Sequence, residues 1–140
     1  MREQWGAEIV VVHDTIYRPH ELPGFVGIVQ GKREGLVTFR MDGGDCEIVT
    51  LASRMEGRGV GTALICAVIA EARRAGAGCV WLVTHNDNVD ALRFYQRRGF
   101  RLVGVNRGAI DRARKLKPEI PEVGRHGIPM HDEVELELLV

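Results

Sequence analysis

The chain has 140 residues, of which 45% are hydrophobic and 27% charged, and its 19 basic and 19 acidic side chains cancel. This composition is typical of one globular domain that is long enough to bury a core without disulfide or metal staples. No apolar run approaches the roughly 18 residues of a membrane span, and the polar start of the chain has no signal segment, so we expect a cytoplasmic protein with no membrane partner.

The first third of the chain has the pattern of short strands. Runs rich in Val, Ile, Phe and Thr predict strands at residues 8–13, 25–30, 36–40 and 46–52. A loop with two prolines follows the first run, and the separators at 31–35 and 42–45 have turn compositions. The last three runs therefore predict an antiparallel meander.

The pattern then changes to helical spacing from Gly59 to Ala75, and the glycines at 76 and 78 indicate where that helix ends. The nearly all-apolar run 79–84 predicts a central strand buried on both faces. Asn88 is an expected N-cap for a helix that runs to residue 98. The remaining predictions are a strand at 100–105, a short helix at 110–117 and a final strand at 134–140. Together they predict one α/β domain, residues 1–140, with a mixed sheet.

Two features of composition leave several explanations open. The three cysteines, Cys46, Cys66 and Cys79, lie in apolar segments without a Cys-x-x-Cys motif, which favours reduced core thiols over a disulfide or a metal site.

Residues 93–117 hold nine basic side chains against Asp111 alone, whereas residues 118–140 are mainly acidic. The basic stretch is compatible with an anion site, a nucleic-acid surface or a solvated face that attracts the acidic tail.

The glycine turn at residues 56–62, Glu-Gly-Arg-Gly-Val-Gly-Thr, lies between a predicted strand and the long helix. Glycines there allow a ligand to approach the backbone, and the unpaired N–H groups of a helix N-terminus suit a pyrophosphate. The residues fit neither a Walker A loop, which needs Gly-Lys-Ser/Thr, nor the Gly-x-Gly-x-x-Gly of dinucleotide-binding folds. A turn that only redirects the chain is the alternative.

Two motifs together resemble the GNAT superfamily of N-acetyltransferases. The turn is similar to that superfamily's Gln/Arg-x-x-Gly-x-Gly/Ala signature, and residues 88–100, N-V-D-A-L-R-F-Y-Q-R-R-G-F, resemble its second motif, Asn-x-x-Ala-x-x-Phe/Leu-Tyr-x-x-x-Gly-Phe. The resemblance covers roughly residues 24–105. It implies a mixed, mostly antiparallel sheet flanked by helices, and direct transfer of acetyl from acetyl-CoA to a primary amine in a ternary complex, without a metal. By resemblance, acetyl-CoA contacts Leu51, Ala52, Ser53, Gly57, Arg58, Gly59, Val60, Gly61, Thr62, Asn88 and Tyr95.

The chain departs from the family pattern in two places. Glu56 stands where the family usually has Gln or Arg, and an acidic side chain beside a pyrophosphate is unfavourable unless it points away. Only residues 13–24 lie where the family usually places two helices between its first and second strands. One wall of the acceptor groove is therefore expected to be shortened. We expect either the segment at 106–133 or a second copy of the chain to take the place of the missing wall. The chain is therefore a candidate for a homodimer.

Glu47 and Tyr95 are the candidate acid–base residues. At pH 7 only about one in a thousand lysine-like amines is neutral, so a general base is needed. Glu47 lies in a Glu-Ile-Val context similar to that of the base in histone acetyltransferases, and its alternative role is a cross-strand ion pair. By alternation, the side chain of Leu51 is expected to lie on the same face of the strand as those of Glu47 and Val49. A backbone N–H near Leu51 is expected to polarise the thioester carbonyl. Tyr95 is the candidate general acid for the CoA thiolate, with simple packing as the alternative.

The histidines carry weaker expectations. His85 ends a predicted strand and either lines the cofactor channel or is structural, and His126 and His131 are candidates for lining the acceptor site because their spacing fits no metal pattern. Acidic residues near the end, Asp132, Glu133 and Glu135, would suit a cationic acceptor of unknown identity. The rival functions are a non-catalytic acyl-CoA sensor and, last, a nucleic-acid-binding domain, since the basic stretch lacks interleaved aromatics and any recognisable module.

Overall fold

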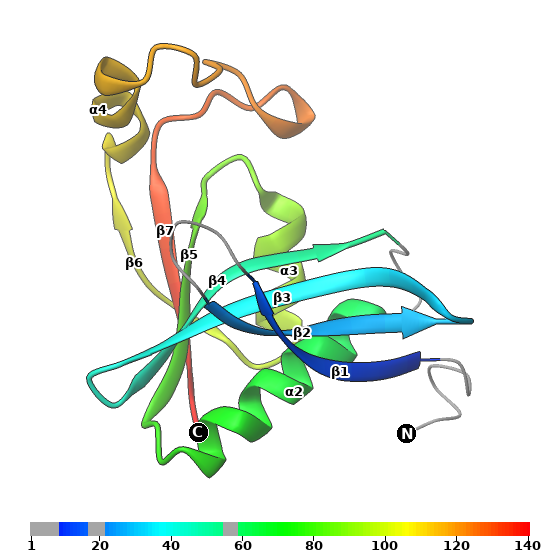
Figure 1. The fold of residues 1–140 in the computed structure, drawn as a ribbon. Coiled ribbons are helices and arrows are strands. Elements are labelled where there is room, and N and C mark those ends of the chain that lie inside the picture. Colours follow the sequence, from blue (N-terminus) through cyan, green and yellow to red (C-terminus); the bar gives the residue numbers. More distant parts are fainter. Residues whose placement is uncertain (1–8, 17–21, 55–58) are drawn as a thin grey trace. The chain divides into compact units, whose positions relative to one another are not determined.

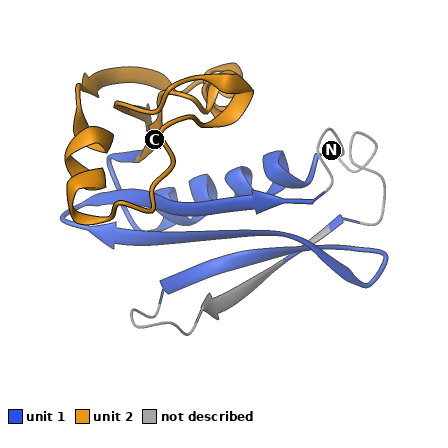
Figure 2. Cartoon of the chain, turned by 90° about the horizontal axis from the view of Figure 1, so that it is seen from above, with its two compact units in different colours: residues 1–80, 139–140 blue, residues 81–138 orange. Residues whose placement is uncertain are grey.

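The computed structural model describes residues 9–16, 22–54 and 59–140. The chain divides into two compact units, residues 1–80 with 139–140 and residues 81–138, which Figure 2 shows in different colours. Strand β5 (Cys79–His85) begins in the first unit and continues in the second.

Unit 1 contains an antiparallel meander (Figure 1). Its strands are β1 (Ile9–Ile16), β2 (Leu22–Val29), β3 (Lys32–Asp42) and β4 (Asp45–Ser53). Each strand pairs antiparallel with the next, which confirms the predicted meander. The strand at 8–13 was expected to end before a loop, but β1 continues to Ile16 and β2 begins at Leu22, so the interval between them is shorter than expected.

Two-residue turns join β2 to β3 and β3 to β4. Gly43 and Gly44 have φ angles of 60° and 94°, and Gln30 and Gly31 have φ angles of 51° and 79°. Two consecutive residues with positive φ match the twist of a tight hairpin. The turn predicted at 42–45 is confirmed. The turn predicted at 31–35 is wrong beyond its first residue, because β3 already begins at Lys32.

The helix predicted from its spacing is present as α2 (Val60–Arg74), and it packs on one face of this meander (Figure 1). A Cβ placed on Gly27 or Gly35 would lie 2.9 Å or 2.6 Å from Cγ1 of Val60. Because glycine has no side chain, these two positions let the start of α2 approach the strands more closely than any other residue type there would allow. The helix buries its apolar stripe there, with Leu64 and Val68 fully buried.

Unit 2 contains the remainder of β5 and the helices and strands that follow it in the chain. In the strand order of the sheet, β7 lies between β5 and β6. Its further elements are α3 (Val89–Arg97), β6 (Arg101–Asn106), α4 (Ala109–Leu116), a short 3-10 helix η1 (Arg125–Gly127) and β7 (Glu133–Leu139). Strands β6 and β7 are antiparallel. These bounds confirm the predicted elements to within two residues.

Two burial expectations need correction. Val83 of β5 is 41% exposed, so only the first half of that strand is buried as predicted. Cys46 and Cys79 are buried, as expected for core cysteines, but Cys66 is exposed, and the expectation of a core thiol there is wrong. Position 66 lies on the solvent side of α2, opposite the stripe that includes Leu64 and Val68. Of the described helices, none is long and apolar enough to cross a membrane.

Candidate functional site

Strand β4 carries a β-bulge at Val49. Thr50 pairs with Thr38 of β3, but the next pair along the strands is Ile48 with Phe39. Val49 is therefore an extra residue without a partner in β3, and its side chain is 39% exposed. A bulge of this kind shifts the alternation of side chains by one position and re-aims the residues that follow.

The bulge determines which β4 side chains share a face. Directly paired residues lie on the same side of a sheet, and every second residue of a strand does too. One face of the two strands carries the pairs Arg40 with Glu47, Thr38 with Thr50, and Leu36 with Ala52. This is the face opposite α2, because the neighbouring position Gly35 is the one that meets Val60 of the helix.

The expectation that Leu51 lies on the same face of the strand as Glu47 is therefore wrong. Leu51 pairs with Val37, which is fully buried on the side of α2, whereas Glu47 lies on the opposite face. Counting every second residue from Glu47 would place Leu51 on the same face, and the extra residue Val49 is what puts the two side chains on different sides. The side chain that follows Glu47 on its own face is Thr50.

Glu47 forms the cross-strand ion pair that was its alternative role. Nη1 of Arg40 lies 3.7 Å from Oε1 of Glu47, and the two side chains are 49% and 23% exposed. An ion pair of this length with a half-exposed partner contributes about 0–1 kcal/mol. The carboxylate is thus oriented by Arg40 but remains partly exposed to solvent.

The glycine turn is described only from Gly59 onwards, and Glu56, Gly57 and Arg58 lie outside the described residues. Gly59 is the N-cap of α2, with φ 84° and ψ 0°, a left-handed conformation that glycine adopts without strain. It provides no side-chain cap, and the first turn, with Val60, Gly61 and Thr62, contains no acidic residue. The positive end of α2 is consequently suited to an anion such as a pyrophosphate.

Asn88 caps α3, as the sequence predicts. Its Oδ1 accepts a hydrogen bond from the backbone N–H of Ala91 at 3.2 Å, and its Nδ2 donates to Oγ1 of Thr84 at 3.1 Å. Asp90 follows in the first turn, where its charge complements the helix dipole. The side chain of Asn88 thus joins the end of β5 to the start of α3, and the nearby His85 is exposed at the last position of β5.

Tyr95 is the buried residue of α3, with 5% of its surface exposed. Its ring makes edge-to-face contacts with Phe94 and Phe100, with centroids 5.1 and 5.2 Å apart. Burial raises the pKa of the Tyr95 phenol well above its usual value, with desolvation as the cause. The hydroxyl is therefore protonated throughout the neutral range and can act as a hydrogen-bond donor. Phe100 is also buried.

The two candidate acceptor-lining histidines each contact an aspartate. Nε2 of His126 lies 2.8 Å from Oδ2 of Asp90, and Nδ1 of His131 lies 2.9 Å from Oδ1 of Asp111. In each pair the hydrogen bond with the histidine is the main reason why the pKa of the aspartate is lowered. Both imidazoles are about half exposed. The structure therefore places His126 beside α3 and His131 beside α4.

Asn86, which the sequence analysis did not single out, holds the excursion before β7 against the end of β5. Its Nδ2 donates to the carbonyl of Pro129 at 2.9 Å, and its Oδ1 accepts from the N–H groups of His131 and Asp132 at 2.9 and 3.0 Å. Its own backbone N–H donates to the carbonyl of Asp132. The partners are more than 40 residues away in sequence, so no local signal indicates this role.

Arg114 is a second organising residue of the excursion. Its guanidinium donates to the carbonyl oxygens of Ile120, Pro121 and Met130, and it pairs with Asp111 at 3.0 Å. Part of the basic excess of residues 93–117 is therefore used inside unit 2 to fold the segment that follows α4. From the sequence alone, this basic stretch was compatible with an anion site, a nucleic-acid surface or a solvated face.

The candidate residues separate by unit. Unit 1 holds Glu47, the end of β4 at residues 51–53, and the start of α2 at residues 59–62. Unit 2 holds Asn88 and Tyr95 on α3 and the two histidines. Within the described parts of both units, no group of three or more His, Cys, Asp or Glu side chains could hold a metal ion.

Comparisons with known proteins identify the family. The model of the acetyltransferase (GNAT) family matches residues 2–100. YdhI, an uncharacterized protein of Bacillus subtilis (strain 168), is 42% identical over 133 residues, which cover 94% of this chain and 83% of that protein.

Solved structures share the fold at low sequence identity. A Bacillus subtilis acetyltransferase in complex with CoA has a TM-score of 0.80 at 18% identity, over 95% of this chain and 99% of that one. A GNAT family acetyltransferase from Elizabethkingia anophelis with acetyl-CoA bound has a TM-score of 0.78, also at 18% identity, with the same coverage. The predicted α/β fold with a mostly antiparallel sheet is confirmed.

Proposed function

Because the chain belongs to the acetyltransferase (GNAT) family, we propose that it moves the acetyl group of acetyl-CoA directly to a primary amine in a ternary complex. The observation that carries this proposal is the β-bulge at Val49, which places Glu47 on the face of β4 that α2 does not cover. A carboxylate there is available to a ligand instead of being used in the core.

Binding of acetyl-CoA is assigned to the end of β4 and the start of α2. The glycine-capped N-terminus of α2 suits the pyrophosphate, since it combines a positive dipole with backbone donors and has no acidic residue in its first turn. The backbone of Leu51, Ala52 and Ser53 would hold the pantetheine arm, and an N–H there would polarise the thioester carbonyl. Asn88 would contribute to the same cofactor from its place at the start of α3.

The transfer itself needs one base and one acid. Glu47 takes a proton from the acceptor ammonium, and the neutral amine nitrogen then attacks the thioester carbon, forming the C–N bond. As the C–S bond breaks, the nitrogen releases its remaining extra proton to solvent to leave the amide. The departing thiolate accepts a hydrogen bond or a proton from the Tyr95 hydroxyl, and a phenol that gives up its proton regains one from solvent. The raised pKa of Tyr95 favours hydrogen bonding over full proton transfer, because the buried phenol retains its proton.

The test combines a binding measurement with a turnover measurement. Titration calorimetry with acetyl-CoA should give saturable heat, and a panel of amines with acetyl-CoA should release free CoA thiol with at least one acceptor. Absence of any heat contradicts the assignment of acetyl-CoA. Saturable binding without thiol release from any amine favours instead a protein that senses acyl-CoA without turnover.

A further inference from the structure

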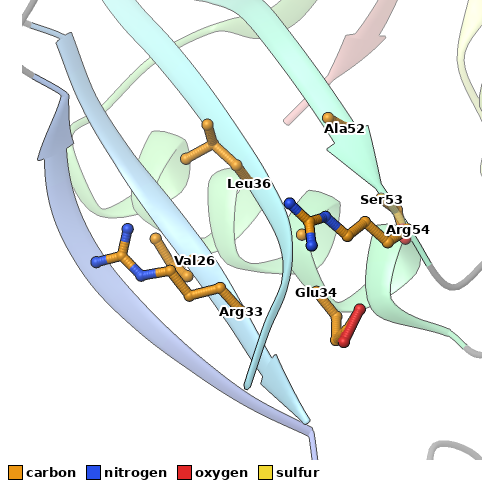
Figure 3. Close-up of a pocket in the computed structure, with 8 residues that line it drawn as sticks. Val26, Arg33, Glu34, Leu36, Ala52, Ser53 and Arg54 are labelled. Carbon is orange, nitrogen blue, oxygen red and sulfur yellow. The ribbon is translucent and has the colours of Figure 1, made fainter. Parts of the chain in front are cut away.

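Unit 1 contains a cavity of about 310 Å³ on the sheet beside the end of β4 (Figure 3). This volume is within the range of small-molecule sites. The residues that line it come from β2, β3 and the end of β4, and they are Val26, Arg33, Glu34, Gly35, Leu36, Ala52, Ser53 and Arg54. The acetyl transfer described above uses the backbone of Ala52 and Ser53 but assigns no role to the rest of the cavity or to its two arginines.

A second β-bulge places the cavity on the face of Glu47. Gly35 pairs with Gly27, but the next pair is Arg33 with Ile28, so Glu34 is an extra residue in β3. Ile28 and Val26 lie on one face of β2, and their partners Arg33 and Leu36 share that face. Leu36 in turn pairs with Ala52, two positions beyond Thr50 on the face that carries Glu47.

The lining has an apolar part and a cationic part. Val26, Leu36 and Ala52 form one row across three strands. The side chains of Arg33 and Arg54 lie beside that row, with the Arg33 guanidinium extending past Val26 (Figure 3). The backbone N–H of Arg54 donates to the carbonyl of Glu34 at 2.8 Å, which fixes where the Arg54 side chain starts. Glu34 is the acidic member of the lining, and its carboxylate points away from the Arg54 guanidinium (Figure 3).

We propose that this cavity binds the far end of the acceptor, and that the acceptor is an amine whose apolar body ends in a carboxylate. The proposal rests on the proposed acetyl transfer with Glu47 as base. Two guanidinium groups repel an ammonium and attract a carboxylate, so they orient the molecule with its amine towards Glu47. The row of Leu36 lies four β3 residues from the row of Arg40 and Glu47, a separation of about 13 Å along the strand.

This separation predicts a preference for length. An acceptor must span most of it to place its amine near Glu47 while its carboxylate meets the arginines. A short amino acid such as 4-aminobutanoate is too short, whereas longer ω-amino carboxylates fit. The apolar row then contacts the methylene chain. The acidic residues near the end of the chain, which had suggested a cationic acceptor, belong to unit 2 and do not line this cavity.

The first experiment measures binding without turnover. Octanoate and octylamine are titrated into the full chain by calorimetry, with the wild type, an Arg33→Gln/Arg54→Gln double variant and Arg73→Gln as a matched control on the exposed end of α2. Octanoate should bind the wild type and the control at least tenfold more tightly than the double variant, and octylamine should bind none of them comparably. Equal binding of octanoate and octylamine, or no change in the double variant, overturns the proposal.

The phosphates of acetyl-CoA are the other source of an anion for these arginines. If the arginines held a phosphate, the double variant would lose affinity for acetyl-CoA by tenfold or more, and acetyl-CoA would displace octanoate. Either result overturns the acceptor assignment. The proposal expects acetyl-CoA affinity to change less than threefold and octanoate to bind equally well in its presence.

The second experiment measures turnover over a series from 4-aminobutanoate to 12-aminododecanoate, each beside the n-alkylamine of equal length. The ratio of kcat/KM for the amino carboxylate over the alkylamine should exceed tenfold for a long member and fall at least tenfold in the double variant. A ratio near one at every length overturns the proposal. If octanoate binds as expected but no amine is acetylated, the proposed transfer fails and the cavity stands as a carboxylate site.

Discussion

Arg40 lies directly opposite Glu47 across β3 and β4, and its guanidinium is 3.7 Å from the Glu47 carboxylate. This pair orients the candidate base on the face opposite α2, and in the proposed transfer an incoming ammonium would compete with Arg40 for the same oxygens. The different roles of the two residues can therefore be tested by mutating each one separately.

Glu47→Gln should lower kcat/KM by roughly 10²-fold, because the amide keeps the shape of the side chain but cannot accept a proton. Arg40→Gln should have a smaller effect, within about tenfold, because Arg40 orients the carboxylate and takes no proton itself. Thiol release under identical acetyl-CoA and amine concentrations measures both. Asp42→Asn, at the exposed end of β3, is the matched control. An unchanged rate for Glu47→Gln removes the assignment of the base.

Tyr95→Phe separates the hydroxyl from the ring. The ring contacts with Phe94 and Phe100 remain, so stability near neutral pH should change little, while kcat should fall by about 10²-fold if the hydroxyl assists the thiolate. Tyr95→Ala should instead cost about 3–5 kcal/mol of unfolding free energy through the lost packing. Urea unfolding and initial rates distinguish the two variants. A Tyr95→Phe protein with wild-type kcat would leave Tyr95 with a packing role only.

The raised pKa of Tyr95 also predicts how stability depends on pH. The unfolded phenol ionises near pH 10, whereas the buried one retains its proton to higher pH, so the folded state binds more protons above pH 10. The stability that this tyrosine contributes is complete below pH 10 and is lost as the pH rises towards its folded pKa. Urea midpoints at pH 9 and pH 11 should therefore differ more for the wild type than for Tyr95→Phe.

How much of the site could be predicted depends on the range of the interactions that build it. The Asn88 cap and the glycine turn of α2 were predictable, because a cap acts over three residues and both signals are local. The bulge at Val49 was not. Residues 46–52 have the apolar, β-branched composition of a strand, and only the pairing with β3 shows which residue is extra. The predicted alternation therefore put Leu51 on the wrong face.

The same limit explains the excursion in unit 2. Asn86 joins the end of β5 to Pro129, His131 and Asp132, and Arg114 donates to three carbonyl groups in the segment after α4. Their side chains satisfy backbone groups of a segment with little regular structure. In the sequence, one was an unremarked loop residue and the other a member of a basic run.

The role of Asn86 can be measured by stability. Asn86→Ala removes three side-chain hydrogen bonds, each worth about 0.5–1.5 kcal/mol, so we expect a loss of about 2–3 kcal/mol. Asn86→Asp keeps an acceptor for the N–H groups of His131 and Asp132 but loses the donor to Pro129. Its free energy of unfolding should therefore lie between those of the wild type and Asn86→Ala. Gln96→Ala, which removes one exposed bond from the end of α3, is the control. A loss as small as that of the control contradicts the organising role.

The two histidine pairs provide reciprocal controls for each other. His126→Gln should raise the pKa of Asp90 towards its usual value, because the hydrogen bond with His126 is the largest cause of its lowering. The same variant should leave Asp111 unchanged, and His131→Gln should do the reverse. Since a lowered carboxyl pKa stabilises the fold above the unfolded value near 4, each contribution disappears as the pH falls through the folded pKa. Carboxyl carbon NMR titrations measure both aspartates.

Gly35→Ala tests whether the start of α2 must lie close to the sheet. An added Cβ would meet Cγ1 of Val60 at 2.6 Å and Cδ1 of Leu64 at 3.0 Å, and it would lie 3.2 Å from the carbonyl of Ala52. Relieving this contact must push the helix outward, with a cost of about 1–3 kcal/mol for overpacking. Because the first residues of α2 are the proposed pyrophosphate donors, acetyl-CoA affinity should fall together with stability.

The matched control for this substitution is Gly104→Ala in β6, where an added Cβ would meet nothing within 4 Å and φ is not positive. It should change the urea midpoint little and leave acetyl-CoA binding intact. The two readouts of Gly35→Ala can be separated with saturating acetyl-CoA, which stabilises a protein by an amount set by its affinity. If the ligand-induced shift in Tm at a fixed acetyl-CoA concentration were as large in Gly35→Ala as in the wild type, the start of α2 would not be the phosphate-binding element.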